Sequence, residues 1–152
     1  MQLNFNNSTN KKYNKYQPIL LKLTKKTFKN LKIKGNYIID LDFVSAAKMQ
    51  SINKKYRQVD RETDVLSFAF LELKKGEIKI KSNKPQLLGE IIISTHKIEA
   101  QAKEFKHTFL YELAYLYVHG LLHLLGYDHV HNKKEEKEMF LLEDKILKGE
   151  KL

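Results

Sequence analysis

The chain has 152 residues, 42% of them hydrophobic and 30% charged, and it contains no cysteine. This length supports one hydrophobic core, and the lack of cysteine excludes disulfides and thiolate metal sites. The 28 basic and 18 acidic residues give a formal net charge of +10, which favours polyanionic partners. No apolar run approaches the roughly 20 residues that cross a bilayer, and residues 1–16 are too polar for a secretory signal. We therefore expect one cytoplasmic domain spanning residues 1–152, without a membrane segment.

The first 34 residues carry most of the positive excess. They hold nine lysines and no acidic residue, which leaves 19 basic and 18 acidic residues in the rest of the chain. Residues 1–16 have no clear period and are expected to form a loose end or a short strand. From Pro18 to about Leu31, apolar residues recur at helical spacing between the lysines, which predicts an amphipathic basic helix. Its candidate contacts to a polyanion, which are equally explained as a solvated helix face, are Lys22, Lys25, Lys26 and Lys29.

The middle of the chain is predicted to form several strands and one helix. Residues 37–44 are mostly apolar and β-branched and predict a strand. A helix is expected from there to about residue 56, with Asp42 and Ser45 as alternative N-cap residues. Further strands are expected at residues 65–70, 77–80 and 88–94, and the last is apolar enough to lie centrally in a sheet.

The second half of the chain is mainly helical. Helices are expected at residues 95–103, 105–125 and 132–147, and the second is apolar nearly all round, so it should be buried. No internal repeat or second linker interrupts this order. The sequence therefore predicts a single-domain α+β fold, with a mixed sheet of about four strands and helices packed around the buried helix at 105–125.

Three histidines in and after that helix have the spacing of a metal site. At about 3.6 residues per turn, His119 and His123 stand on one helix face and can share one ion. His129 can join them only if the chain turns back, and Gly126 is placed to end the helix in a left-handed conformation. Three neutral nitrogen ligands without a fourth protein ligand are typical of a catalytic zinc. A single histidine here would more simply be a core residue, but three at this spacing favour a metal.

Gly120 distinguishes this histidine motif from the motif of a zinc protease. The spacing H-x3-H-x2-G-x2-H is that of the long metzincin signature, in which a glutamate follows the first histidine as general base. In this chain Gly120 follows His119, so the ligands are kept and the protease base is missing. Asp128 is a candidate hydrogen-bond partner for a ligand imidazole, and it is equally explained as a turn or cap residue.

Arg57 and Arg61 are the only arginines in a chain that otherwise uses lysine for positive charge. A guanidinium presents a rigid planar fork suited to two oxygens of one phosphate. This chemistry favours Arg57 as a functional residue. The alternative is a surface ion pair with Asp60 or Glu62, and for Arg61 that alternative is favoured.

Three segments together resemble the YbeY family of bacterial metal-dependent endoribonucleases. They are the histidine motif at 118–129, the run Thr-Asp-Val-Leu-Ser-Phe at 63–68, and Met-Phe-Leu-Leu-Glu at 139–143. The resemblance extends from about residue 41 to residue 147. Two departures are Glu62, where proline often precedes the run, and Glu90, where aspartate is usual. The resemblance implies a catalytic role for Arg57 and one Zn²⁺ per chain bound by His119, His123 and His129.

The same resemblance implies a cellular role. It points to cleavage of single-stranded or ribosomal RNA, to maturation of the 3′ end of 16S ribosomal RNA and to ribosome quality control. The implied partners are the small ribosomal subunit and its proteins.

The expected reaction is hydrolysis of an RNA phosphodiester. A zinc-bound water has a pKa of about 7 in a protein site, so a separate strong base is less necessary. The same ion, or Arg57, would neutralise charge that develops on the phosphate. Glu90 or a substrate hydroxyl is a candidate to assist with the proton. The lysines of residues 1–34, and Arg61, are candidate RNA contacts. Tyrosines such as Tyr13, Tyr16 or Tyr127 are candidates on which bases stack, although core packing is favoured for most of the eight tyrosines.

Two other functions fit parts of the sequence. The histidine spacing suggests a metalloprotease, which Gly120 opposes. The positive charge also fits a non-catalytic RNA-binding assembly factor in which a structural metal braces the helix end. Ser67 is interpreted as a packed strand residue, because no G-x-S-x-G elbow surrounds it.

Overall fold

A mixed four-stranded sheet forms the frame of the molecule in the computed structural model, which describes residues 1–71, 73, 84–128 and 132–152. Along the sheet the strand order is β1-β2-β4-β3. β1 pairs in parallel with β2 and β2 with β4, whereas β3 is antiparallel to β4 and forms one edge. The strand bounds are Gln2–Asn7 for β1, Tyr37–Val44 for β2, Val65–Ala69 for β3 and Gln86–Ser94 for β4.

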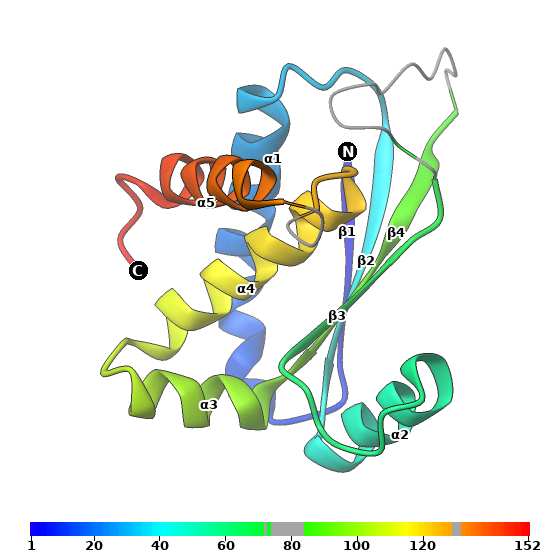
Figure 1. Ribbon diagram of the computed structural model, residues 1–152, viewed down its shortest axis with the longest axis vertical. Helices are drawn as coiled ribbons and strands as arrows, with labels where there is room; N and C mark the ends of the chain where they lie inside the picture. The colour runs from blue at the N-terminus through cyan, green and yellow to red at the C-terminus, as the bar shows by residue number, and fades with distance from the viewer. Residues whose placement is uncertain (72, 74–83, 129–131) are drawn as a thin grey trace.

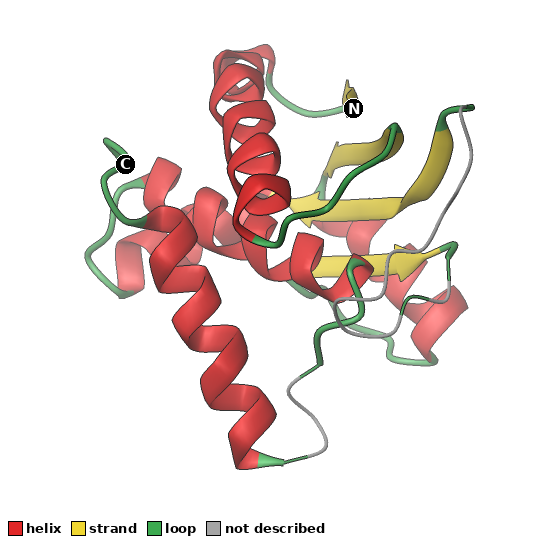
Figure 2. Cartoon of the chain, turned by 90° about the horizontal axis from the view of Figure 1, so that it is seen from above, coloured by secondary structure: helices red, strands yellow, loops and turns green. Residues whose placement is uncertain are grey.

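Helices cover the two faces of this sheet unequally. In Figures 1 and 2, α1, α4 and α5 gather on one side of the sheet, and Figure 1 places α2 on the other. A short 3₁₀ helix, η1, precedes α1. The helix bounds are Lys11–Tyr16 for η1, Gln17–Asn30 for α1, Ala46–Arg57 for α2, Thr95–Glu104 for α3, Phe109–Leu124 for α4 and Lys133–Leu147 for α5.

The alternation of side chains along β2 creates the two faces. Ile39, Leu41 and Phe43 are fully buried in the main core, which they share with the apolar residues of α4. Successive side chains of a strand point to opposite faces, so Asp40 and Asp42 lie on the other face. There they accept hydrogen bonds from asparagines of β1.

The second face carries only a small core under α2. Val44, Met49, Leu66 and Ile92 form this cluster. Ser45 is the N-cap of α2, and its hydroxyl accepts the backbone N–H of Lys48 at 3.3 Å. This settles the choice between the two possible caps in favour of Ser45, because Asp42 belongs to β2.

α4 is the central helix, but it begins later than residue 105, where the sequence predicted its start. Lys106 has a positive φ of 58°, which interrupts the helical backbone after α3. Thr108 then caps α4 by accepting the N–H of Tyr111 at 2.9 Å. The start at 105 is therefore wrong, whereas burial on nearly all sides is confirmed by the ten buried residues of α4.

The fold class predicted from the sequence is confirmed, and the choice between the two alternatives left open for residues 1–16 can be decided. Residues 1–16, for which a loose end or a short strand was expected, contain β1, whose Leu3 is buried in the main core. The strand expected at residues 77–80 lies outside the described residues. None of the helices in the described part of the chain is long and apolar enough to span a membrane.

Candidate metal centre and its pocket

His119 and His123 present their imidazoles to one another from successive turns of α4. Their Nε2 atoms are 3.0 Å apart, and the ring planes are inclined at 84° with centroids 4.6 Å apart. The i, i+4 spacing brings the rings together, as expected on one face of a helix.

The other ring nitrogen of each histidine is held by a fixed acceptor. Nδ1 of His119 lies 2.7 Å from Oε1 of Glu143, which belongs to α5 and has a side chain only 4% exposed. Nδ1 of His123 lies 2.9 Å from the backbone carbonyl oxygen of Tyr127. Because a carboxylate and a carbonyl only accept hydrogen bonds, each Nδ1 carries a proton, and in the neutral form of each ring the lone pair is on Nε2.

Gly126 creates the turn that brings the Tyr127 carbonyl back to the helix. It has a positive φ of 82°, and the backbone N–H of Tyr127 donates to the carbonyl of Leu122 at 3.0 Å. These are features of a glycine-terminated helix end. The predicted helix break at Gly126 is therefore confirmed.

This arrangement suits a divalent metal ion. Two Nε2 lone pairs facing each other at 3.0 Å repel unless a cation or a proton lies between them. Hydrogen bonds from Nδ1 to a carboxylate and to a backbone carbonyl are also the usual outer contacts of metal-binding histidines. The donor set fits zinc, which prefers imidazole nitrogen and tolerates an open coordination position.

The third predicted ligand, His129, lies outside the described residues. Within residues 1–71, 73, 84–128 and 132–152, no group of three potential ligands comes together. The complete set of three histidines therefore stays a prediction, and the described structure contributes two of its members with their supporting contacts.

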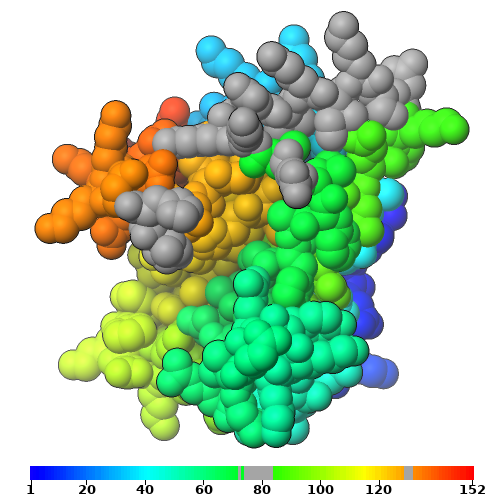
Figure 3. All heavy atoms as spheres, turned by 45° about the vertical axis from the view of Figure 1, so that its right-hand side comes forward, coloured from blue at the N-terminus to red at the C-terminus, as the bar shows by residue number. Residues whose placement is uncertain are grey.

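His119 and His123 line a pocket of about 430 Å³, which we call the histidine pocket. It is lined by β3 together with Arg57, His119, His123 and Asp128. Ser67 of β3 also lines it, and the surfaces of α4 and β3 adjoin on the face shown in Figure 3. The pocket thus combines the imidazole pair, one guanidinium and one carboxylate.

Arg57 reaches this pocket from the last residue of α2. Its Nη2 donates to the backbone carbonyl oxygen of Ser67 at 3.3 Å, and its guanidinium lies 5.3 Å from the centre of the Phe68 ring. Asp60, one of its two alternative partners, is instead paired with Lys54 at 2.7 Å. The structure therefore brings Arg57 and the histidines to one pocket.

Gly120 lets α4 approach β3 closely. A Cβ atom at this position would lie 2.8 Å from Oγ of Ser67 and 3.2 Å from Cγ2 of Ile91. The position faces the sheet, so a glutamate there would require α4 and β3 to separate. This contact explains why the general base of the metzincin pattern is absent, and it confirms that Ser67 packs against the helix.

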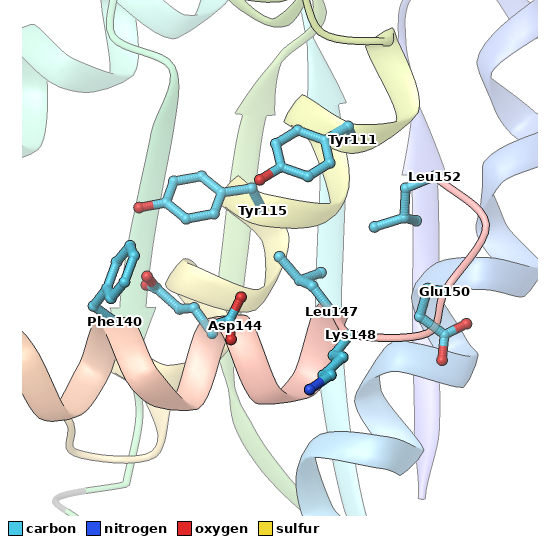
Figure 4. A pocket seen from close by; sticks show the side chains of 9 residues that line it. Tyr111, Tyr115, Phe140, Asp144, Leu147, Lys148, Glu150 and Leu152 are labelled. Carbon is cyan, nitrogen blue, oxygen red and sulfur yellow. The ribbon is translucent and has the colours of Figure 1, made fainter.

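Glu143 was assigned no role from the sequence, although it belongs to the 139–143 segment. Glu143 also lines a separate pocket between α4 and α5, together with residues such as Tyr111, Tyr115 and Asp144 (Figure 4). Burial and the neighbouring Glu143 carboxylate raise the pKa of Tyr115 to about 12. The signal available in the sequence was an acidic residue that directly follows four apolar residues at 139–142.

The four lysines predicted on the basic helix, which are Lys22, Lys25, Lys26 and Lys29, lie on α1 and do not belong to the described lining of the histidine pocket. Nζ of Lys22 and Nζ of Lys26 pair with Glu150 at 2.7 and 3.0 Å, which attaches the end of the described chain to α1. Lys25 and Lys29 are exposed. Arg61 is also exposed, and its backbone carbonyl accepts a hydrogen bond from Asn53. An RNA contact by any of these side chains stays a prediction.

The candidate role of Glu90 is wrong, whereas the core packing favoured for most tyrosines is confirmed for two of the three that were named. Glu90 lies opposite Asp40 on the sheet face away from α4, because Ile91 and Ile93 occupy the α4 side of β4, so Glu90 is not placed to assist in the histidine pocket. Tyr13 and Tyr127 are buried in the core and are not stacking surfaces. Tyr16 stacks on Phe109 instead, with centroids 5.3 Å apart.

Comparison with known proteins identifies relatives over nearly the whole chain. The family model described as Endoribonuclease YbeY matches residues 2–151. An Endoribonuclease YbeY of Oenococcus oeni is 46% identical over 132 residues, which cover 84% of each chain. One of Lysinibacillus sphaericus is 40% identical over 97% of this chain and 94% of its own.

A solved structure shares the fold. The solution structure of a Thermotoga maritima protein, TM1509, aligns with a TM-score of 0.61 and 28% identity over 95% of this chain and 86% of that one.

Proposed function

Because the chain belongs to the YbeY family of endoribonucleases, we propose that it hydrolyses phosphodiester bonds of single-stranded RNA in the histidine pocket, with one Zn²⁺ bound by His119, His123 and His129. The observation that carries this proposal is the pair of Nε2 atoms 3.0 Å apart, with both Nδ1 atoms fixed, in the same pocket as Arg57. When bound, zinc supplies Lewis acidity and makes hydroxide available near neutral pH.

Glu143 and the Tyr127 carbonyl prepare the histidines for this role. They hold the Nδ1 protons, keep the Nε2 lone pairs directed at one point and limit rotation of the rings. Fixing these orientations in advance avoids a reorganisation cost when the ion and the substrate bind. These two residues are positioning groups because they act through the imidazoles.

Arg57 binds and neutralises the phosphate in this proposal. A guanidinium has five N–H donors, and the Ser67 carbonyl accepts one of them. That bond and the Phe68 ring fix the plane of the guanidinium at the side of the histidine pocket. A guanidinium in fixed orientation stabilises negative charge that develops on the phosphoryl oxygens during attack.

Asp128 is the one carboxylate among the described residues that line the pocket. Its hydrogen bond to a ligand imidazole stays a prediction, because the adjacent His129 lies outside the described residues.

The cellular role in this proposal is maturation of the 3′ end of 16S ribosomal RNA and ribosome quality control in the cytoplasm, through contacts with the small ribosomal subunit and its proteins. A single endoribonuclease domain spanning residues 1–152 is part of the same proposal. The family match and the net charge of +10 support an RNA substrate.

The proposal is tested with purified protein and a fluorescently labelled single-stranded RNA. Cleavage should stop with a chelator and return with Zn²⁺. His123→Ala should abolish cleavage while circular dichroism and the thermal midpoint stay close to those of the wild type. His96→Ala is the matched control, because that imidazole lies on α3 and is 64% exposed. Cleavage by His123→Ala at the wild-type rate would exclude the histidine pocket as the active site.

The same preparations distinguish the two alternatives. Unfolding on chelation, with no RNA cleavage by the intact protein, would favour an assembly factor braced by a structural metal. Metal-dependent cleavage of casein without cleavage of RNA would favour a metalloprotease. The packing of Gly120 against Ser67 argues against a protease.

A further inference from the structure

A second cavity lies between α2 and β3, on the sheet face opposite the main core. It has a volume of about 530 Å³, within the range of about 300–1,000 Å³ that is usual for ligand sites. We call it the aromatic cavity. The surfaces of α2 and β3 adjoin in Figure 3. The lining residues that matter here are Lys48, Lys55, Tyr56, Phe68, Phe70 and Glu90.

Two of its three aromatic rings are exposed. Tyr56 is 55% exposed and Phe70 is 53% exposed. The ring centroids of Tyr56 and Phe68 are 5.4 Å apart, and the planes are inclined at 61°. Exposed aromatic residues scattered singly are ordinary features of a surface, but rings gathered in one cavity mark a site for a ligand. Flat apolar ligands, such as nucleobases, stack on rings of this kind.

The charges around the cavity indicate what kind of ligand these rings take. Lys48 and Lys55 are seven residues apart on α2, so both lie on the same helix face as the cavity. Nζ of Lys55 lies 5.1 Å from the centre of the Tyr56 ring. Glu90 contributes a carboxyl group, which can accept hydrogen bonds from the amino group of a base. Aromatic rings beside lysines match a base followed by its phosphate.

Phe68 and Arg57 connect this cavity with the histidine pocket. Ser67 lines the histidine pocket and Phe68 lines the aromatic cavity, because successive residues of β3 point to opposite faces. Arg57 lines the histidine pocket and donates to the Ser67 carbonyl, and its guanidinium also lies over the ring of Phe68, which lines the aromatic cavity. Among the strands of the described residues, β3 lies at the edge of the sheet. A polynucleotide that leaves the histidine pocket past Arg57 would therefore next meet the Phe68 ring, which lines the aromatic cavity.

We propose that the aromatic cavity is a nucleobase subsite, which binds one base of a single-stranded RNA by stacking on Tyr56 and Phe70 while Lys48 and Lys55 contact its phosphates. The subsite rests on the proposed function, because it extends the substrate path from the histidine pocket. Its contribution is to hold the RNA beside Arg57. It therefore acts on substrate binding and not on the chemical step.

The test measures steady-state cleavage of a labelled single-stranded RNA by Tyr56→Ala and Phe70→Ala. Each variant should raise KM about 5- to 150-fold, the loss expected for one stacked base, with kcat within about twofold of the wild type. Tyr56→Phe should recover most of the loss because it keeps the ring. Phe105→Ala is the matched control, since Phe105 is 54% exposed and lies at the end of α3. It should have the wild-type KM.

A second substrate series locates the base. A single abasic nucleotide is moved along the RNA, and at one position its effect on KM should be large for the wild-type protein and nearly absent for Tyr56→Ala. Such non-additivity identifies a direct contact between the missing base and the missing ring.

The outcomes separate the subsite from the proposed function. One outcome is that the wild type cleaves RNA and that Tyr56→Ala and Phe70→Ala have the same KM as Phe105→Ala. This would refute the subsite and leave the proposed function intact. A fall in kcat at constant KM would also refute it, because this would indicate displacement of Arg57. If the wild type does not cleave RNA, binding in the presence of a chelator decides. Weaker binding by the two alanine variants would then support the subsite, although the proposed function has failed.

Discussion

Replacement of Glu143 by glutamine should weaken zinc binding about tenfold. The Glu143 carboxylate accepts the Nδ1 proton of His119 at 2.7 Å, and its side chain is only 4% exposed, so solvent screens the interaction little. A hydrogen bond to a charged group contributes about 1.5–3 kcal/mol and a neutral one about 0.5–1.5 kcal/mol. The difference of roughly 1–1.5 kcal/mol corresponds to about a tenfold change in affinity. Glu143→Ala removes the acceptor as well and should approach a loss of about 100-fold.

The assay is competition for Zn²⁺ between the protein and a chromophoric chelator at pH 7. Asp144→Asn is the matched control, because it removes one carboxylate from the next position of α5, where the residue is exposed. It should bind zinc within about twofold of the wild type. Thermal unfolding of the metal-free proteins verifies that each variant is folded.

Equal zinc affinity for Glu143→Gln and the wild type would refute this reasoning. It would mean that the contact between Glu143 and His119 stabilises the packing of α5 on α4 and does not support a metal ligand. A graded loss from glutamine to alanine, together with unchanged binding by Asp144→Asn, would support it.

Three further outcomes are expected. Arg57→Lys should lower kcat at least about tenfold with KM within about threefold, because lysine keeps the charge and loses the planar fork; equal losses in both would indicate simple charge binding. Gly89→Ala should destabilise the protein by about 1–3 kcal/mol in urea unfolding, since its Cβ would lie 2.3 Å from the Phe68 carbonyl oxygen. Hydrogen bonds from Lys22 and Lys26 lower the pKa of Glu150 below its usual 4.5, so the stability they add is present above that pH and lost below it. Glu150→Gln should therefore cost about 0.5 kcal/mol at pH 7, and the difference should vanish in acid.

Local patterns were sufficient for most elements of the fold. The strand predicted at 37–44 has the bounds of β2, and the predicted helix break at Gly126 occurs where expected. β1 was left undecided because its alternate residues are asparagines, which bond to Asp40 and Asp42 across the open sheet face. The start of α4 was misplaced because the left-handed turn at Lys106 leaves no clear mark in the sequence.

The parts of the site that sequence could not supply depend on tertiary contacts. His119 and Glu143 are 24 residues apart on different helices, so no helical or strand period relates them. The wrong role given to Glu90 has the same origin, because the face on which a strand residue lies depends on the register of the sheet. Arg57 was recognised from composition and from the family resemblance, and its place beside the histidines follows from the packing of α2 under β3.

We propose that the histidine pocket is the site of metal-dependent RNA hydrolysis. A zinc titration of the metal-free protein tests this most directly, with the initial rate of single-stranded RNA cleavage as the readout. We predict no cleavage without metal, a linear rise up to about one equivalent of zinc per chain and a plateau beyond it, and no rise at all for His123→Ala. Cleavage at the full rate by the metal-free protein, or an equal response by His123→Ala, would contradict the claim.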